Sequence, residues 1–175
     1  ANNVALGTNS LTTNTTASYI TGVGFQALKA NTTGAANAAF GADALLANTT
    51  GGANTAMGNN ALTANTTGAN NVALGKDALT AATTASNNVA IGFAAAGALT
   101  TGTQNVGIGF QALDAVTTSN SNTAIGYQSM TTMTSGNQNV AVGSGSLHSS
   151  TSATNSVAVG FNALTTNTTG VDNIA

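Results

Sequence analysis

Residues 54–70 read NTAMGNNALTANTTGAN, and residues 71–87 repeat the pattern as NVALGKDALTAATTASN. From Asn3 onward this 17-residue unit runs ten times with no insertion or deletion. The units are residues 3–19, 20–36, 37–53, 54–70, 71–87, 88–104, 105–121, 122–138, 139–155 and 156–172. Ten copies in constant phase indicate one continuous repeat array in which each unit contacts only its neighbours. We number the positions of a unit as places one to seventeen.

The array is cut within a unit at both ends of the 175-residue sequence. Residues 1–2 match places sixteen and seventeen, and residues 173–175 open an eleventh unit. Since neither end has a polar capping unit, we expect the array to continue or to abut other copies.

Each unit predicts one coil of a β-solenoid. Place one is mostly Asn, place two is mostly Val or Thr, place three is a small residue and place four is a large apolar residue. This pattern favours a short strand. A second strand is expected at places eight and nine, Ala or Ser followed mostly by Leu, and the Asn-Thr-Thr-Gly at places twelve to fifteen is typical of a turn. A helical repeat needs about 33 residues. The predicted fold is therefore all-β, a parallel β-solenoid of ten 17-residue coils.

Place five is Gly in every unit, which predicts a corner that needs positive φ or a close backbone approach. These corner glycines are Gly7, Gly24, Gly41, Gly58, Gly75, Gly92, Gly109, Gly126, Gly143 and Gly160.

Stacked coils explain the composition. Each place would recur about 4.8 Å above itself, so a charged place would become a column of like charges. The chain has 2 Lys+Arg and 4 Asp+Glu, but 32 Thr and 24 Asn. Asn side chains can instead form hydrogen-bonded ladders. The candidates for such a ladder at place one are Asn3, Asn37, Asn54, Asn71, Asn88, Asn105, Asn122, Asn139 and Asn173.

Place three is only Ala or Gly, although a solvent-facing strand position is usually polar. One interpretation is that place three lies on an outer face covered by another chain. The other is that place three fills a cramped interior while places two and four form the outer wall. We favour the first, which predicts self-association.

The segments at residues 88–93, 105–110 and 122–128, together with the Ala-Leu and Asn-Thr-Thr-Gly of other units, as at residues 27–28 and 31–34, resemble the head repeats of trimeric autotransporter adhesins and similar arrays of phage tail fibres and bacterial surface fibres. The resemblance implies a left-handed, homotrimeric parallel β-roll that serves as a rod or head on a cell surface or virion. It carries over no catalytic or binding residues. The adhesin unit is usually shorter than 17 residues.

Composition argues against several classes of function. With 3% charged residues the chain lacks the cations that nucleic acid or anionic lipid requires, and no apolar run approaches the roughly 18 residues of a membrane span. There is no Cys, and His148 stands two coils, about 10 Å, from Asp114. Matches to G-x-G-x-x-A at residues 22–27 and 107–112 are not expected to precede a helix. We therefore predict no enzymatic activity, no cofactor and no metal.

Three surface features are open to a second interpretation. The N-x-T sequons could carry covalent glycans, although Asn-Thr-Thr-Gly is more simply a favoured turn. An unbroken Thr column at place thirteen is compatible with ice binding, but its partner Thr is adjacent and would point to the other side. Aromatics at place six could stack on carbohydrate, with packing between chains as the simpler interpretation. The sequon residues are Asn14, Asn31, Asn48, Asn65 and Asn167.

The predicted function is structural: the shaft or head segment of an extracellular or virion fibre, with an adhesive role and copies of itself as partners. The alternative is an ice-binding or glycan-decorated self-assembling surface filament.

Overall fold

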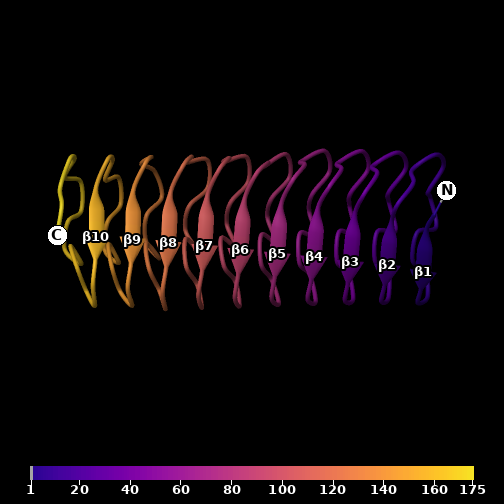
Figure 1. The fold of residues 1–175 in the computed structure, drawn as a ribbon, viewed down its shortest axis with the longest axis horizontal. Coiled ribbons are helices and arrows are strands. Elements are labelled where there is room, and N and C mark those ends of the chain that lie inside the picture. Colours follow the sequence, from indigo (N-terminus) through magenta and orange to yellow (C-terminus); the bar gives the residue numbers. More distant parts are fainter. Residues whose placement is uncertain (1) are drawn as a thin grey trace.

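The computed structural model describes residues 2–175 as a row of coils (Figure 1). One parallel ten-stranded sheet runs the length of the row in the order β1 to β10, and no helix occurs among the described residues. The strands are β1 (Val4–Leu6), β2 (Thr21–Val23), β3 (Ala38–Phe40), β4 (Thr55–Met57), β5 (Val72–Leu74), β6 (Val89–Ile91), β7 (Val106–Ile108), β8 (Thr123–Ile125), β9 (Val140–Val142) and β10 (Val157–Val159).

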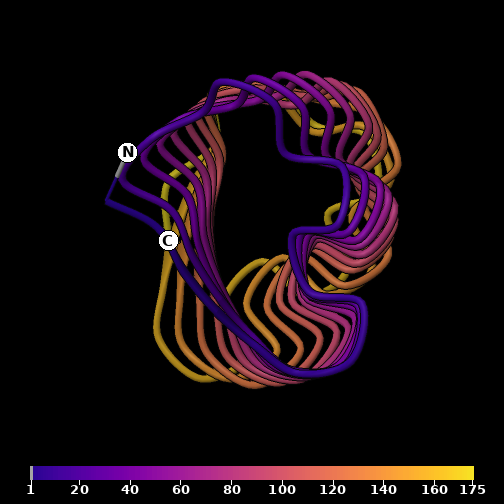
Figure 2. The same ribbon diagram turned by 90° about the vertical axis from the view of Figure 1, so that its right-hand side faces the viewer.

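Successive strands pair in the register that the repeat predicts, with every residue opposite the residue 17 positions away. Leu74 pairs with Ile91, for example, and Ile91 with Ile108. Viewed along the row, the coils lie one behind another with nearly the same outline (Figure 2). The prediction of an all-β parallel solenoid with 17-residue turns is confirmed.

The strand in each coil is one residue shorter than expected, because place one lies outside it. The backbone N–H of Asn54 donates to the side-chain Oδ1 of Asn37 in the preceding coil, at 2.9 Å. The Asn37 side chain thus accepts from the backbone N–H of Asn54, which would otherwise be free to extend the hydrogen-bond pattern of the strand.

The predicted second strand is wrong. Places eight and nine form turns, and all ten place-nine residues have φ between 48° and 60°. Leucine rarely adopts this left-handed conformation, which costs roughly 1–2 kcal/mol per residue. Two interactions offset the cost at Leu62: its N–H donates to the carbonyl of Ala78 at 3.0 Å, and its side chain is fully buried.

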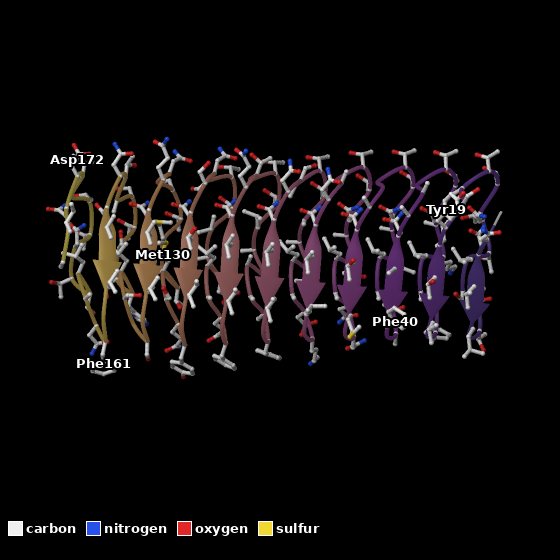
Figure 3. All side chains as sticks on the ribbon, in the orientation of Figure 1. Tyr19, Phe40, Met130, Phe161 and Asp172 are labelled. Atoms are coloured by element: carbon white, nitrogen blue, oxygen red, sulfur yellow. The ribbon has the colours of Figure 1, made fainter. Side chains whose placement is uncertain are left out.

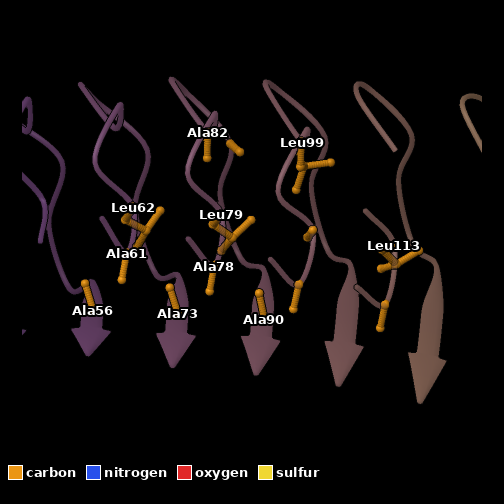
Figure 4. Close-up of a cluster of buried hydrophobic side chains, with 14 of the residues drawn as sticks. Ala56, Ala61, Leu62, Ala73, Ala78, Leu79, Ala82, Ala90, Leu99 and Leu113 are labelled. Carbon is orange, nitrogen blue, oxygen red and sulfur yellow. The ribbon is translucent and has the colours of Figure 1, made fainter. Parts of the chain in front are cut away.

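The core is a column of small and medium side chains repeated from coil to coil. In coil four, Ala56 on the strand packs with Ala61 and Leu62 at places eight and nine, and Ala73, Ala78 and Leu79 repeat the arrangement in coil five (Figure 4). At these three places the interior has room for about one Leu and two Ala per coil, which contributes to the low residue mass of the sequence.

Candidate functional site

The corner glycines have the backbone conformation for which glycine is suited. Their φ values lie between 131° and 141°. A Cβ added at Gly41 would lie 2.6 Å from the carbonyl oxygen of Gly58, and one at Gly109 would collide with the carbonyl oxygen of Gly126. Both the dihedral angle and the close stacking of corners therefore exclude a side chain at place five.

The asparagine ladder predicted at place one is present from Asn37 to Asn139. Asn3 and Asn173 do not join it, because their neighbours at this place are Ile20 and Ser156. The Oδ1 of Asn71 accepts from both the backbone N and the Nδ2 of Asn88, at 3.0 and 3.1 Å. The same pattern continues through Asn105, Asn122 and Asn139. Because these side chains are buried, each amide satisfies its neighbour where water cannot.

Sequence reasoning missed a second ladder, at place twelve. The Nδ2 of Asn48 donates to the Oδ1 of Asn31, and the Nδ2 of Asn65 donates to the Oδ1 of Asn48, both at 2.7 Å. Each Nδ2 also donates to the place-fifteen carbonyl of its own coil, as Asn48 does to Gly51 at 2.9 Å. That carbonyl accepts from the place-one ladder too, through Asn37 at 2.7 Å, so the two ladders are linked.

This second ladder consists of predicted glycan sites. Asn31, Asn48 and Asn65 are fully buried, and a glycan on Nδ2 would have to displace the hydrogen bonds just described. Such a glycan is incompatible with this fold. Asn14 and Asn167 are half-buried, and each donates to the carbonyl three residues later.

The size of the place-twelve residue is matched by the residue at place fifteen. Besides meeting the place-fifteen carbonyl of the next coil, a Cβ on Gly34 would lie 2.7 Å from Asn31 Oδ1, and a Cβ on Gly102 would lie 2.6 Å from Leu99 Cδ1. Coils with Ala, Val or Ser at place twelve instead carry Ala or Ser at place fifteen. The first coil, with Asn14 and Ala17, departs from this pairing. The pairing is visible in the sequence and is the signal that could have identified place twelve as interior.

The outward face of the sheet is apolar, which corrects the interpretation of place three. In β3 to β10 every place-three residue is buried within the single chain, so the expectation that place three forms an outer face is wrong. Places two and four point outward: Phe40 is 37% exposed, Met57 49% and Ile125 37%. We call the outward side chains at these two places the sheet face. It carries no charged residue in any of the ten strands, and three Thr are its only polar members.

The place-six side chains project from the corner beyond each strand, as Phe161 does below β10 (Figure 3). Three consecutive coils there carry rings that stack: Phe93 on Phe110 with centroids 5.4 Å apart, and Phe110 on Tyr127 with centroids 5.3 Å apart. We call these three residues the aromatic column. The Nζ of Lys76 lies 5.6 Å from the centroid of Phe93, a cation–π contact at one end of the column.

The residues considered for catalysis are not brought together. His148 Nδ1 lies 3.5 Å from the hydroxyl of its neighbour Ser149, and burial raises the pKa of Asp114. The two G-x-G-x-x-A segments are ordinary coils: Gly22 and Gly107 lie in the core and Gly24 and Gly109 form corners. Turns follow both segments, and neither presents a helix N-terminus to a pyrophosphate.

The threonine column at place thirteen stabilises the stack. The hydroxyl of Thr49 donates to the carbonyl of Thr66, and that of Thr66 to the carbonyl of Thr83, both at 3.0 Å. These hydroxyl protons therefore bond to the next coil and are not directed to solvent, and the hydroxyl oxygens keep only their capacity to accept.

Across residues 2–175 there is no enclosed pocket, and no group of three or more His, Asp or Glu side chains is placed to hold a metal ion. The same residues contain no helix with the length and apolar character to cross a bilayer. Comparison of the chain with protein families, with curated proteins and with solved structures finds no match.

Proposed function

We propose that the chain is a load-bearing segment of an extracellular fibre, a shaft or head in which copies associate side by side through the sheet face and which also carries adhesive contacts. The observation that supports this most is the sheet face itself. It is apolar, uncharged and continuous from β1 to β10. A contiguous apolar surface of this kind marks an interaction site.

A second copy is the partner that fits this surface best. Two copies share the same coil spacing, so a side chain that fits between two neighbours in one coil fits equally in every other coil. Ten strands of three residues present about 500 Å² per copy, which brings a pair to the lower bound of about 1,000 Å² for a specific interface. The buried area grows with each added coil. The resemblance to adhesin and tail-fibre repeats implies a homotrimer, and we propose that its copies would meet through their sheet faces.

The stability of the single rod supports a mechanical role. Backbone hydrogen bonds, both asparagine ladders and the threonine column all run from coil to coil. The backbone bonds recur at every step and the side-chain ladders reinforce runs of consecutive coils, so stiffness does not depend on one central core.

Sedimentation equilibrium tests the association. We expect the wild-type chain to form an oligomer and Ile91→Lys to shift it to monomer, because a buried, unpaired ammonium on the sheet face costs several kcal/mol. Thr101→Lys, in the same coil at exposed place fourteen, is the matched control and should leave the oligomer intact. Circular dichroism checks that both variants are folded. A wild-type chain that sediments as a monomer at its highest attainable concentration would contradict the proposal.

A further inference from the structure

The aromatic column is a half-exposed surface that the sheet face does not include. Phe93, Phe110 and Tyr127 are 42%, 40% and 55% exposed, although each already packs against a neighbouring ring. Elsewhere place six carries single rings: Phe25, for instance, lies between Thr8 and Ala42 in the adjacent coils. The continuous stretch of three rings is therefore a local feature of coils six to eight.

A pair of amide side chains lies beside the column, at place seven. The Nε2 of Gln128 donates to the Oε1 of Gln111 at 3.1 Å. Side chains at places six and seven are neighbours elsewhere in the array, since Lys76 Nζ lies 3.5 Å from Asp77 Oδ2. Within the described chain the remaining amide atoms of the pair, Gln111 Nε2 and Gln128 Oε1, make no hydrogen bond, so one donor and one acceptor stay available.

Half-exposed aromatic rings next to amide groups match the apolar and the polar surface of a sugar ring. The C–H face of a pyranose packs on an aromatic ring, and its hydroxyl groups exchange hydrogen bonds with amides. The ring spacing repeats along the rod axis, which suits a ligand that is itself a polymer with one sugar per ring. Lys76 is the one cation at the column, too few to hold a nucleic acid strand by its phosphates.

We propose that the aromatic column and the Gln111–Gln128 pair bind a neutral, extended glycan lying along the rod axis. This rests on the adhesive part of the proposed function and names its ligand class. Contact with a second copy of the chain fits the column less well. Identical rods packed side by side repeat their contact in every coil, as the sheet face does, whereas the column occupies three coils out of ten.

Ligand-observed saturation-transfer NMR and calorimetry test the proposal with three neutral probes: a β-linked glucose hexamer, an α-linked glucose hexamer and a hexamer of N-acetylglucosamine. We expect the wild-type chain to bind at least one of them. Phe110→Ala should weaken that binding about tenfold, the factor for losing one stacked ring, and Phe110→Leu keeps the apolar bulk should the alanine variant unfold. Gln111→Leu should also weaken binding.

Phe25→Ala is the matched control, since it removes a place-six ring that also precedes a glutamine but has no neighbour to stack on. Its affinity should equal that of the wild type. Absence of saturation transfer to all three probes would overturn the proposal, as would an equal loss in Phe25→Ala and Phe110→Ala. A Phe110→Ala variant that changes the sedimentation of the chain while the wild type binds no glycan would assign the column to contacts between copies instead.

The glycan proposal and the self-association proposal can each be refuted without refuting the other. The monomeric Ile91→Lys variant keeps the aromatic column and should bind the probe as the wild type does. Glycan binding without self-association would refute the side-by-side assembly alone, and self-association without glycan binding would refute the glycan site alone.

Discussion

Coils two to four and coils five to eight share one backbone but fill place twelve in opposite ways. In residues 20–70 the place is Asn31, Asn48 and Asn65, and in residues 71–138 it is apolar. All of these side chains are fully buried. The apolar set is Ala82, Leu99, Val116 and Met133. The backbone of the coil therefore fixes where the place-twelve side chains stack, but it does not fix whether they are polar. Buried amides are tolerated where they hydrogen-bond to one another, and apolar side chains are tolerated where they pack together.

The boundary between the two regions shows the cost of mixing them. Asn65 is the last amide of the ladder, and its Oδ1 has no hydrogen-bond partner because Ala82 occupies place twelve in the next coil. A buried acceptor left unpaired costs about 1–3 kcal/mol. The ladder therefore has a weak point at its end, and the apolar region has none of this kind at place twelve.

The largest effect should be the same in both regions, because both depend on the corner. We expect Gly58→Val and Gly109→Val each to cost more than about 4 kcal/mol, since valine cannot adopt the corner φ and its Cβ would meet the next carbonyl. Urea denaturation followed by circular dichroism measures this. Gly52→Ala is the control, because Ala35 and Ala69 occupy the same place in adjacent coils. A mild effect in one region alone would show that the regions differ at their corners too.

Exchanging the place-twelve residues should separate the regions. Leu99→Asn should cost about 3–5 kcal/mol, because it removes a buried apolar side chain and leaves an amide with no ladder partner. Asn48→Leu should also destabilise the chain, by about 1–3 kcal/mol for each of the two ladder hydrogen bonds that it removes, the donor to Asn31 Oδ1 and the acceptor for Asn65 Nδ2, with part of the loss offset because Gly51 leaves room for the leucine. The same denaturation experiment compares them. A negligible cost for Leu99→Asn would mean that place twelve tolerates isolated amides, and a negligible cost for Asn48→Leu would mean that the ladder adds nothing.

Extending the ladder should strengthen its end. Ala82→Asn alone should destabilise the chain, because the Cβ of Ala85 occupies the space that place-fifteen glycine leaves for Oδ1 in coils two to four. Adding Ala85→Gly should recover about 1–3 kcal/mol through the new donor to Asn65 Oδ1 and the relieved contact. A double-mutant cycle measures this coupling. Strict additivity would refute the pairing of places twelve and fifteen.

The smallest effect concerns a charge in the apolar region. Burial raises the pKa of Asp114, so the folded state holds its proton to higher pH than the unfolded state does. The ionised carboxylate thus opposes folding at neutral pH, and this penalty vanishes below the usual pKa of about 3.9. Asp114→Asn should raise the free energy of unfolding at pH 7 by less than about 1 kcal/mol, and leave it unchanged near pH 3, as urea denaturation at the two pH values measures. A stabilisation that persists at low pH would assign the effect to packing.

The sequence predicts the parts of this fold that every coil repeats with one residue type. Place five needs glycine for a conformational reason, and place one is asparagine in nearly every unit, so the corner and the first ladder follow directly. At place nine, a backbone hydrogen bond to the next coil and burial hold the leucine in a left-handed conformation that leucine intrinsically disfavours. Because local propensity does not include these contacts, it predicts a strand there. Place three was ambiguous because, with no charged residue on either side of the strand, alternation alone does not tell inside from outside.

The candidate sites, too, were only partly predictable from the sequence. The Asn-Thr-Thr-Gly segment is equally typical of an exposed turn, a glycan acceptor and a buried ladder, and only the neighbouring coil decides between them. The aromatic column was visible as a recurrence at place six, but its stacking depends on three rings in consecutive coils adopting the same side-chain orientation.

Distances between spin labels along one column test the stacked rod most directly. The chain has no cysteine, so paired cysteines can be placed at exposed place fourteen without background labelling. Thr33→Cys with Thr118→Cys lie five coils apart, and Thr16→Cys with Thr169→Cys lie nine apart. Electron–electron double resonance should give distances of about 24 Å and about 43 Å, in proportion to the number of coils. Distances that fail to grow with coil number, or a distribution as broad as that of an unfolded chain, would contradict the stack.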